Sequence, residues 1–205
     1  MQFALAVPVL EDKLLQVAVT QILLAIYEVD FLPCSYGYRL GLSAHDAIKA
    51  LTDELQFGGH HFVVEADIKG FFDNLRWEWL ERMLEQRIAD GAFLNLIRKW
   101  LRAGILEEDG RVIHPQTGTP QGGVVWPVLA NIYLHYVLDL WFERVVRPRQ
   151  RGRCWIIRYA DDSGVWTFGA GLGAQDRVDP GASGNDLYTR PDAFERGSGR
   201  GARAH

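Results

Sequence analysis

The sequence is poor in the residues that build disulfide frameworks, zinc sites and membrane spans. Its two cysteines, Cys34 and Cys154, lie far apart and show no Cys-x-x-Cys or Cys/His spacing. We therefore expect two reduced thiols in the core of a cytoplasmic protein. The longest apolar stretch, residues 14–27, is interrupted by Gln16 and Gln21 and is too short to cross a bilayer. These features predict a chain that has no membrane partner.

The sequence also lacks an overall positive charge. The net charge is −4, so no global basic signal points to nucleic acid, although arginines crowd residues 144–158. Hydrophobic residues make up 48% of the 205 residues, enough for one domain with a core. Residues 169–205 lack tryptophan and apolar periodicity and are rich in Gly, Asp, Arg, Ser and Ala. We expect a folded domain over residues 1–168, followed by a disordered tail.

Hydrophobic periodicity predicts helices alternating with short strands. Ser43, three residues before Asp46, indicates a capped helix start. The residues after Pro8 predict a helix from Glu11 that is apolar on most faces, which is typical of a buried helix. The remaining expected elements are a strand over residues 61–68, helices over 77–88 and 92–102, and a hairpin over 105–113.

A long helix is expected after Pro127. It carries a polar row with i, i+4 spacing at Asn131, His135 and Asp139, of which His135 is most simply a surface or packing residue. Its expected buried face comprises Leu129, Ile132, Tyr133, Tyr136, Val137, Leu140 and Trp141.

The segment Tyr159-Ala160-Asp161-Asp162 lies between two short, aromatic-rich apolar runs that predict strands. Two adjacent aspartates at a hairpin tip repel each other, and a divalent cation such as Mg²⁺ removes that penalty. A solvated Asp-Asp turn is the simpler alternative. Asp67, at the end of an earlier predicted strand, would supply a third carboxylate if the strands are neighbours.

Two further positions have both a structural and a functional interpretation. Phe72, five residues after Asp67, is either a core residue beside Phe71 or an aromatic that contacts the sugar of a nucleotide. Gln121, in a glycine-rich loop, is either a turn residue or a hydrogen-bonding group for a nucleotide or template.

The arginines of residues 144–158 likewise have two interpretations. They form either a solvated linker or a contact surface for nucleic-acid phosphates. The candidates for phosphate contact are Arg147, Arg149, Arg151 and Arg153.

Taken in order along the chain, these motifs resemble the reverse transcriptase domain of group II intron-encoded proteins. The resemblance covers about residues 7–168. It rests on Ser35-Tyr36-Gly37-Tyr38-Arg39, residues 66–73, residues 118–123, Leu129-Ala130-Asn131-Ile132-Tyr133-Leu134-His135 and Arg158-Tyr159-Ala160-Asp161-Asp162.

The resemblance implies an α+β fold: a right-hand polymerase palm with partial fingers, in which a small antiparallel sheet packs on helices and the thumb is absent. It implies RNA-directed DNA polymerase activity on an RNA template and a DNA primer, with dNTPs as substrates. Proteins of this family also act as maturases, which bind their own intron RNA, so the resemblance implies intron RNA as a further partner. The implied site has two Mg²⁺ ions at Asp67, Asp161 and Asp162 with Ile68 alongside, and a nucleotide pocket. That pocket comprises Phe72 as steric gate, Gln121, Pro120, Gly122 and Arg39.

The sequence also departs from the family pattern. Leu40 and Leu42 replace a proline and an arginine that are usual after Arg39, and residues 169–205 match no family segment. We therefore expect a copy incomplete at both ends, consistent with a frameshift or gene truncation, and weak or absent primer extension by this chain alone. The alternatives are a non-catalytic, maturase-like RNA-binding remnant and, more distantly, a nucleotidyl cyclase built on a similar palm.

Overall fold

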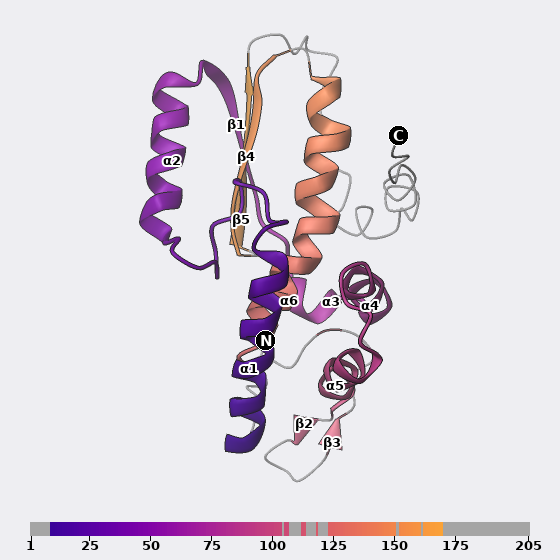
Figure 1. Cartoon of the computed structure of the whole chain (residues 1–205). Coiled ribbons are helices and arrows are strands. Elements are labelled where there is room, and N and C mark those ends of the chain that lie inside the picture. The colour runs from indigo at the N-terminus through magenta and orange to yellow at the C-terminus, as the bar shows by residue number, and fades with distance from the viewer. Residues whose placement is uncertain are drawn as a thin grey trace, which may run out of the picture.

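The computed structural model describes residues 9–103, 105–106, 112–113, 118, 123–150, 152–160 and 162–169. This part of the chain forms a three-stranded antiparallel sheet, with α2 on one face and the long helix that continues α6 on the other (Figure 1). The strands are β1 (His60–Ala66), β4 (Cys154–Tyr159) and β5 (Asp162–Gly169), in the order β1-β5-β4. Because β5 lies between the other two, β1 pairs with a strand that is far from it in the sequence.

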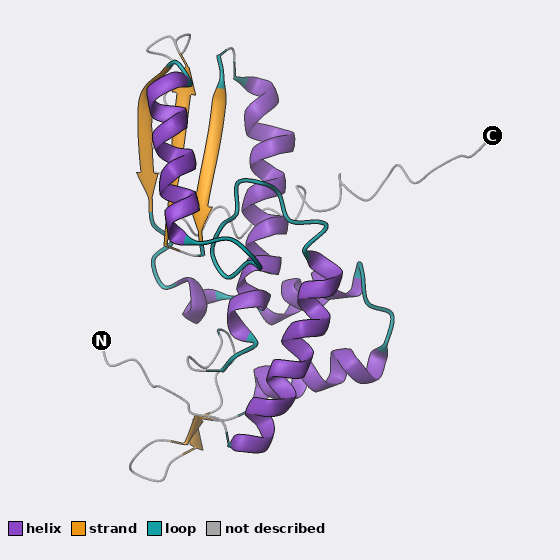
Figure 2. Cartoon of the chain, turned by 60° about the vertical axis from the view of Figure 1, so that its left-hand side comes forward, coloured by secondary structure: helices purple, strands orange, loops and turns teal. Residues whose placement is uncertain are grey.

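The remaining helices gather below the sheet (Figure 2). The α-helices are α1 (Leu10–Tyr27), α2 (Ala44–Phe57), α3 (Phe71–Asn74), α4 (Trp77–Glu85), α5 (Gly91–Arg102) and α6 (Trp126–Leu134). The helix α6 continues through wider π-helical turns, η1 (His135–Asp139) and η2 (Phe142–Val146), into a 3-10 turn, η3 (Arg147–Arg149). A small antiparallel hairpin pairs β2 (Ile105–Leu106) with β3 (Val112–Ile113).

Side-chain caps fix the start of two helices. Ser43 and Asp46 form the predicted capping box, in which Ser43 N donates to Asp46 Oδ2 at 2.8 Å and Asp46 N donates to Ser43 Oγ at 3.3 Å. Asp90 caps α5 by accepting from Ala92 N at 2.8 Å and Phe93 N at 3.1 Å. Each cap satisfies backbone donors that the first helical turn leaves without a partner.

The core lies where α1, α4, α5 and α6 meet. Fully buried leucines come from each of these helices: Leu23, Leu80, Leu101 and Leu129. The hydroxyl of Tyr27 donates to the carbonyl of Met83 at 3.2 Å, which ties the end of α1 to α4. Both cysteines are free and buried, as predicted, and burial raises the pKa of the Cys34 thiol to about 12.

The prediction that α1 is buried on most faces is wrong. One face, including Val19 and Leu23, is buried, whereas Leu14 is 64% exposed. Polar partners select this face: Gln16 accepts a hydrogen bond from the backbone of Val124, and Tyr27 donates one to α4. Apolar content alone could not distinguish the face that packs.

The predicted buried face of the long helix is also partly wrong. Leu129, Ile132 and Tyr133 are buried as expected. The other four residues of the expected face are only half-buried: Tyr136, Val137, Leu140 and Trp141. The polar row Asn131, His135 and Asp139 is more deeply buried than these four residues, at 1%, 4% and 0% exposure. Asn131 and Asp139 are buried because they bond to Arg158, as described below, whereas His135 packs between the rings of Phe31 and Tyr136.

In the described part of the chain, no helix is long and apolar enough to cross a membrane. The last described strand, β5, ends at Gly169. Gly169, the first residue of the expected disordered tail 169–205, thus belongs to a strand, and the rest of that expectation falls outside the described residues.

Two leucines of α1 test which face of this helix packs. We expect Leu23→Ala, at a fully buried position, to lower the free energy of unfolding by about 2–5 kcal/mol because it leaves a cavity. Leu14→Ala, in the same helix but on the exposed face, should change it by no more than ~0.5 kcal/mol. Urea denaturation of the two variants measures both values. Equal losses would contradict the packing of α1.

Candidate functional site

The end of β1 and the β4–β5 turn lie at the same end of the sheet, toward α3 and α6 (Figure 1). The last pair between β1 and β5 is Ala66 with Gly164. Continuing this antiparallel register by one residue places Asp67 opposite Ser163, the neighbour of Asp162. Adjacent strands are about 4.8 Å apart. The backbone positions of Asp67 and Asp162 are therefore close.

The other predicted metal-site residues are placed less completely. The side chain of Asp67 is exposed, and that of Ile68 packs against the core. Asp161 lies outside the described residues. Within the described part, no group of three or more His, Cys, Asp or Glu side chains is placed to hold a metal ion. The three-aspartate set stays a prediction.

The glycine-rich loop is anchored beside Phe72 at its start. Gly118 N donates to the carbonyl of Leu75 at 2.9 Å, and Trp77 Nε1 donates to the carbonyl of Gly118 at 2.6 Å. Gly118 has a φ of +83°, and a Cβ there would lie 2.7 Å from the carbonyl oxygen of Phe72. Only glycine allows this close approach. The loop therefore begins in close contact with the backbone of Phe72 and Asp73.

The far end of the same loop is anchored on α1. Val124 N donates to Gln16 Oε1 at 2.9 Å. A Cβ at Gly123 would lie 2.8 Å from that oxygen and 2.5 Å from Trp126 Nε1. Residues 119–122, which include the predicted Pro120, Gln121 and Gly122, lie outside the described residues. Their two flanks are held by α1 and by α3.

Phe72 is half-buried, and its ring meets that of Phe71 edge-on with centroids 5.3 Å apart. It therefore combines core packing with a partly exposed surface next to Gly118. Both interpretations made from the sequence remain compatible with this position, and its role as a steric gate stays a prediction.

Arg39, a predicted nucleotide-binding residue, bonds extensively to its own loop. Its Nη2 lies 2.6 Å from Glu28 Oε1, and its Nη1 donates to the carbonyls of Leu32 at 3.0 Å and Ser35 at 3.1 Å. The guanidinium also lies over the ring of Phe31, at 5.4 Å from the centroid. These contacts shape the loop from α1 to α2.

The arginines predicted to contact phosphates lie at the far end of the long helix. Arg147 bonds both carboxylate oxygens of Glu143, at 2.6 and 2.7 Å, and Arg153 lies 3.3 Å from Glu54. Arg149 is exposed, and Arg151 lies outside the described residues. Arg147 and Arg153 keep half or more of their side-chain surface exposed, so phosphate contact stays a prediction.

Arg158 differs from the other arginines of this segment because its residue is only 1% exposed. Its guanidinium is paired with the buried carboxylate of Asp139, through Nε–Oδ1 at 3.0 Å and Nη2–Oδ2 at 2.8 Å. It also donates to Asn131 Oδ1 at 2.8 Å, Ser35 Oγ at 2.8 Å and the carbonyl of Ala160 at 3.0 Å. All five of its N–H donors thus have acceptors. We call these five residues the Arg158 network.

Sequence reasoning missed this network by grouping Arg158 with the solvated arginines. One signal was available: Asn131 and Asp139 are two helical turns apart on a mostly apolar helix. A buried carboxylate needs a cationic or hydrogen-bonding partner. The family motif that lies nearest along the sequence and contains an arginine is Arg158-Tyr159-Ala160-Asp161-Asp162. Its arginine was therefore the candidate partner.

The backbone of the Ser35–Gly37 segment lies against the turn that follows β4. Ser35 forms a parallel bridge with Arg158, and Arg158 N donates to the carbonyl of Cys34 at 2.7 Å. A Cβ on Gly37 would lie 2.3 Å from Ala160 N, and Asn131 Nδ2 donates to the carbonyl of Gly37 at 2.6 Å. The Ser35–Gly37 segment therefore packs directly on the residue that precedes Asp161.

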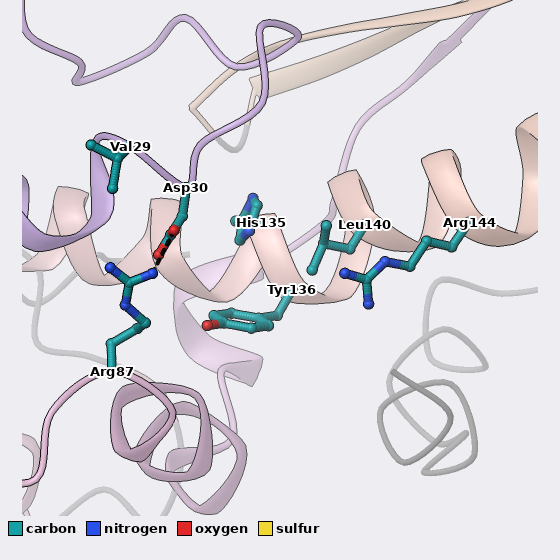
Figure 3. Close-up of a pocket in the computed structure, with 7 residues that line it drawn as sticks. All are labelled: Val29, Asp30, Arg87, His135, Tyr136, Leu140 and Arg144. Carbon is teal, nitrogen blue, oxygen red and sulfur yellow. Dashed lines mark hydrogen bonds and ion pairs between the residues drawn. The ribbon is translucent and has the colours of Figure 1, made fainter. Parts of the chain in front are cut away.

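A separate hollow of about 360 Å³ lies on another side of the long helix (Figure 3). It is lined by Val29, Asp30, Arg87, His135, Tyr136, Leu140 and Arg144. Arg87 Nη1 bonds Asp30 Oδ1 at 2.6 Å, while Asp30 Oδ2 and His135 Nδ1 are buried atoms without a partner among the described residues. Both residues line the hollow, which is large enough to hold water.

Comparison with known proteins identifies the family to which the chain belongs. Residues 3–168 match the family described as reverse transcriptase (RNA-dependent DNA polymerase). The chain belongs to the reverse transcriptase family. The match includes every motif on which the resemblance was based, and it confirms that reading of the sequence.

Several similar proteins have names that refer to introns. The group II intron-encoded protein LtrA of Lactococcus lactis subsp. cremoris is 45% identical over 140 residues, covering 66% of this chain and 23% of that protein. An uncharacterized 91 kDa protein in the cob intron of Schizosaccharomyces pombe is 42% identical, with 65% and 16% covered. This reverse transcriptase chain thus corresponds to a quarter or less of the length of these relatives.

A solved structure supports the fold independently of sequence. Telomerase from Candida albicans, solved in complex with a fragment of telomeric RNA, has a TM-score of 0.57 at 16% identity. The match covers 76% of this chain and 30% of that one. At this identity the likeness concerns the fold alone, and it confirms a mixed helix and strand architecture of the reverse transcriptase type.

Two glycines test the anchoring of the loop on α3. Gly118 and Gly41 both have positive φ, +83° and +73°, but only Gly118 has atoms within 4 Å of an added Cβ. We expect Gly118→Ala to lower the free energy of unfolding by about 1–3 kcal/mol more than Gly41→Ala, because it adds a clash to the same backbone strain. Chemical denaturation measures both losses. Equal losses would contradict the close approach of Gly118 to Phe72.

His135 predicts a pH dependence of stability. Burial lowers the pKa of its imidazole, with opposing contributions from Asp139 and Asp30, which raise it, and from Arg158 and Arg144, which lower it. Below about pH 6.5, the unfolded chain takes up a proton that the folded chain does not, so stability is lost as pH falls.

We expect His135→Gln to flatten the fall in unfolding free energy between about pH 7 and pH 5. Denaturation at several pH values measures the slope, and His45→Gln, at an exposed position on α2, is the matched control for loss of an imidazole. An unchanged slope in His135→Gln would show that His135 does not cause it.

Proposed function

We propose that this chain is the nucleotidyl-transfer part of an RNA-directed DNA polymerase of the group II intron type. It would add dNTPs to the 3′-hydroxyl of a DNA primer paired with an RNA template. Family membership supports the activity, and the intron-encoded relatives support the type. The observation that carries the proposal is the register of the sheet, which brings the end of β1 beside the start of β5.

The carboxylates at this end of the sheet fit a magnesium site. Asp67, Asp161 and Asp162 supply the hard oxygen ligands that Mg²⁺ takes in proteins, and the exposure of Asp67 leaves room for phosphate and water oxygens. Two bound Mg²⁺ ions would supply the charge that stabilises the attacking and leaving oxygens of a phosphoryl transfer. The chain itself would contribute by holding its carboxylates close together despite their mutual repulsion.

The pocket for the incoming nucleotide would lie between Phe72 and the glycine-rich loop. Phe72 would contact the sugar, where an aromatic ring excludes a ribose 2′-hydroxyl, and Gln121 would offer its amide to the nucleotide. The glycine-rich loop begins at Gly118, which is anchored on the backbone of Phe72. This contact supports the arrangement, because it keeps the start of the loop next to Phe72. Nucleic-acid phosphates would meet Arg147, Arg149, Arg151 and Arg153.

Metal binding tests the proposal without requiring a complete polymerase. We expect the full chain to bind Mn²⁺, used as a paramagnetic substitute for Mg²⁺, and Asp67→Asn to weaken binding because a charged ligand is lost. Electron paramagnetic resonance titration of free Mn²⁺ measures both affinities. Asp53→Asn, at an exposed site on α2, is the matched control for charge. Equal Mn²⁺ affinity in wild type and Asp67→Asn would contradict the site.

Primer extension separates the catalytic proposal from the alternative. We expect extension of a DNA primer on an RNA template to be weak in this chain and absent in Asp67→Asn. RNA binding that persists in Asp67→Asn, with no extension by either protein, would instead favour a non-catalytic, maturase-like RNA-binding role. Product analysis with NTPs alone excludes or reveals a cyclase.

A further inference from the structure

The Arg158 network ends on the peptide group that leads into the two aspartates. Arg158 Nη1 donates to the carbonyl of Ala160 at 3.0 Å. This carbonyl and the amide nitrogen of Asp161 belong to one planar peptide group. A hydrogen bond to the carbonyl therefore restrains the peptide group that joins Ala160 to Asp161.

Ala160 itself has an unusual conformation. Its φ is +54°, in the left-handed region that residues with a Cβ seldom adopt, and it is buried. Such a conformation persists only when its surroundings impose it. Two neighbours surround it here: the guanidinium of Arg158 bonds its carbonyl, and the backbone of Gly37 lies so close that a Cβ on Gly37 would clash with its nitrogen.

Asn131 joins these two restraints. Its Oδ1 accepts from Arg158 Nη1 at 2.8 Å, and its Nδ2 donates to the carbonyl of Gly37 at 2.6 Å. The carboxylate of Asp139 takes two further donors of the same guanidinium and fixes its plane. A fork bonded in this way on every N–H has a single orientation.

Stability alone does not account for such an arrangement. A buried ion pair contributes little net stability compared with well-packed apolar residues of similar volume, because both charges lose their hydration. Its specific effect is geometric, and this geometry is directed at one turn.

We propose that Arg158, oriented by Asp139 and Asn131, is a positioning residue for the metal-binding carboxylates. It holds Ala160 in the left-handed conformation, so that the chain carrying Asp161 and Asp162 leaves β4 in the direction that meets the end of β1. This inference rests on the proposed metal site, but it concerns residues outside that site.

The decisive variant replaces the ion pair by apolar residues of similar size. Arg158→Met combined with Asp139→Leu removes both charges together and avoids leaving one buried and unpaired. We expect this double variant to fold, as judged by circular dichroism and thermal unfolding, and to bind Mn²⁺ about 10–100-fold more weakly, the usual effect of losing a residue that orients metal ligands.

Two further variants distinguish positioning from general support of the fold. Arg87→Met combined with Asp30→Leu removes an Arg–Asp ion pair outside the Arg158 network, and should keep Mn²⁺ affinity close to that of wild type. Ala160→Gly, added to the double variant, should restore part of the affinity, because glycine adopts positive φ without steric cost. If the double variant does not fold, Arg158→Lys replaces it, since lysine keeps the charge but loses the five-donor fork.

A metal-free measurement keeps this inference separate from the proposed function. The ¹³C chemical shifts of Ala160 report its positive φ, and we expect that signature in wild type and its loss in the double variant. A folded double variant that retains the signature, or retains wild-type Mn²⁺ affinity, would overturn the positioning role. Wild-type protein that shows the signature but binds no Mn²⁺ would overturn the metal site and, with it, the purpose assigned to Arg158.

Discussion

The buried pair of Arg158 and Asp139 is the interaction on which the candidate site depends. Both side chains are almost fully removed from solvent, at 2% and 0% exposure. Removing one partner of such a pair costs about 3–5 kcal/mol, since the other charge stays buried without compensation. The pair links η1 to β4, and through Ser35 it also links the loop between α1 and α2. Three segments far apart in sequence thus meet at the turn before the two aspartates.

Close backbone contacts complete the arrangement. Gly37 packs on Ala160, and Gly118 packs on Phe72. In each case a Cβ would occupy space already taken by backbone, so glycine is required by the neighbour and not only by its own turn. The motifs that mark the family are therefore contact points between strands, loops and helices.

The sequence allowed the hairpin at Tyr159–Asp162, the capped start of α2 and most element positions to be predicted, because these depend on local signals. It did not reveal which face of α1 packs, since leucines lie all around that helix and polar partners decide. It gave the wrong environment for Arg158, and it did not reveal that Asn131 and Asp139 are buried beside it. Burial of a charged residue depends on a partner elsewhere in the chain, and no local pattern identifies that partner. Family resemblance named the aspartates, but the structure was needed to find what holds their turn.

The most direct test of the central claim, that the end of β1 and the β4–β5 turn form one metal site, is crystallographic. Crystals of this chain soaked in Mn²⁺ should show an anomalous scattering peak between the carboxylates of Asp67 and Asp162. Each of these carboxylates would lie at coordination distance, about 2.0–2.6 Å, as expected for oxygen ligands of small divalent cations. A peak elsewhere, or fully ordered carboxylates that point apart with no metal between them, would contradict the account.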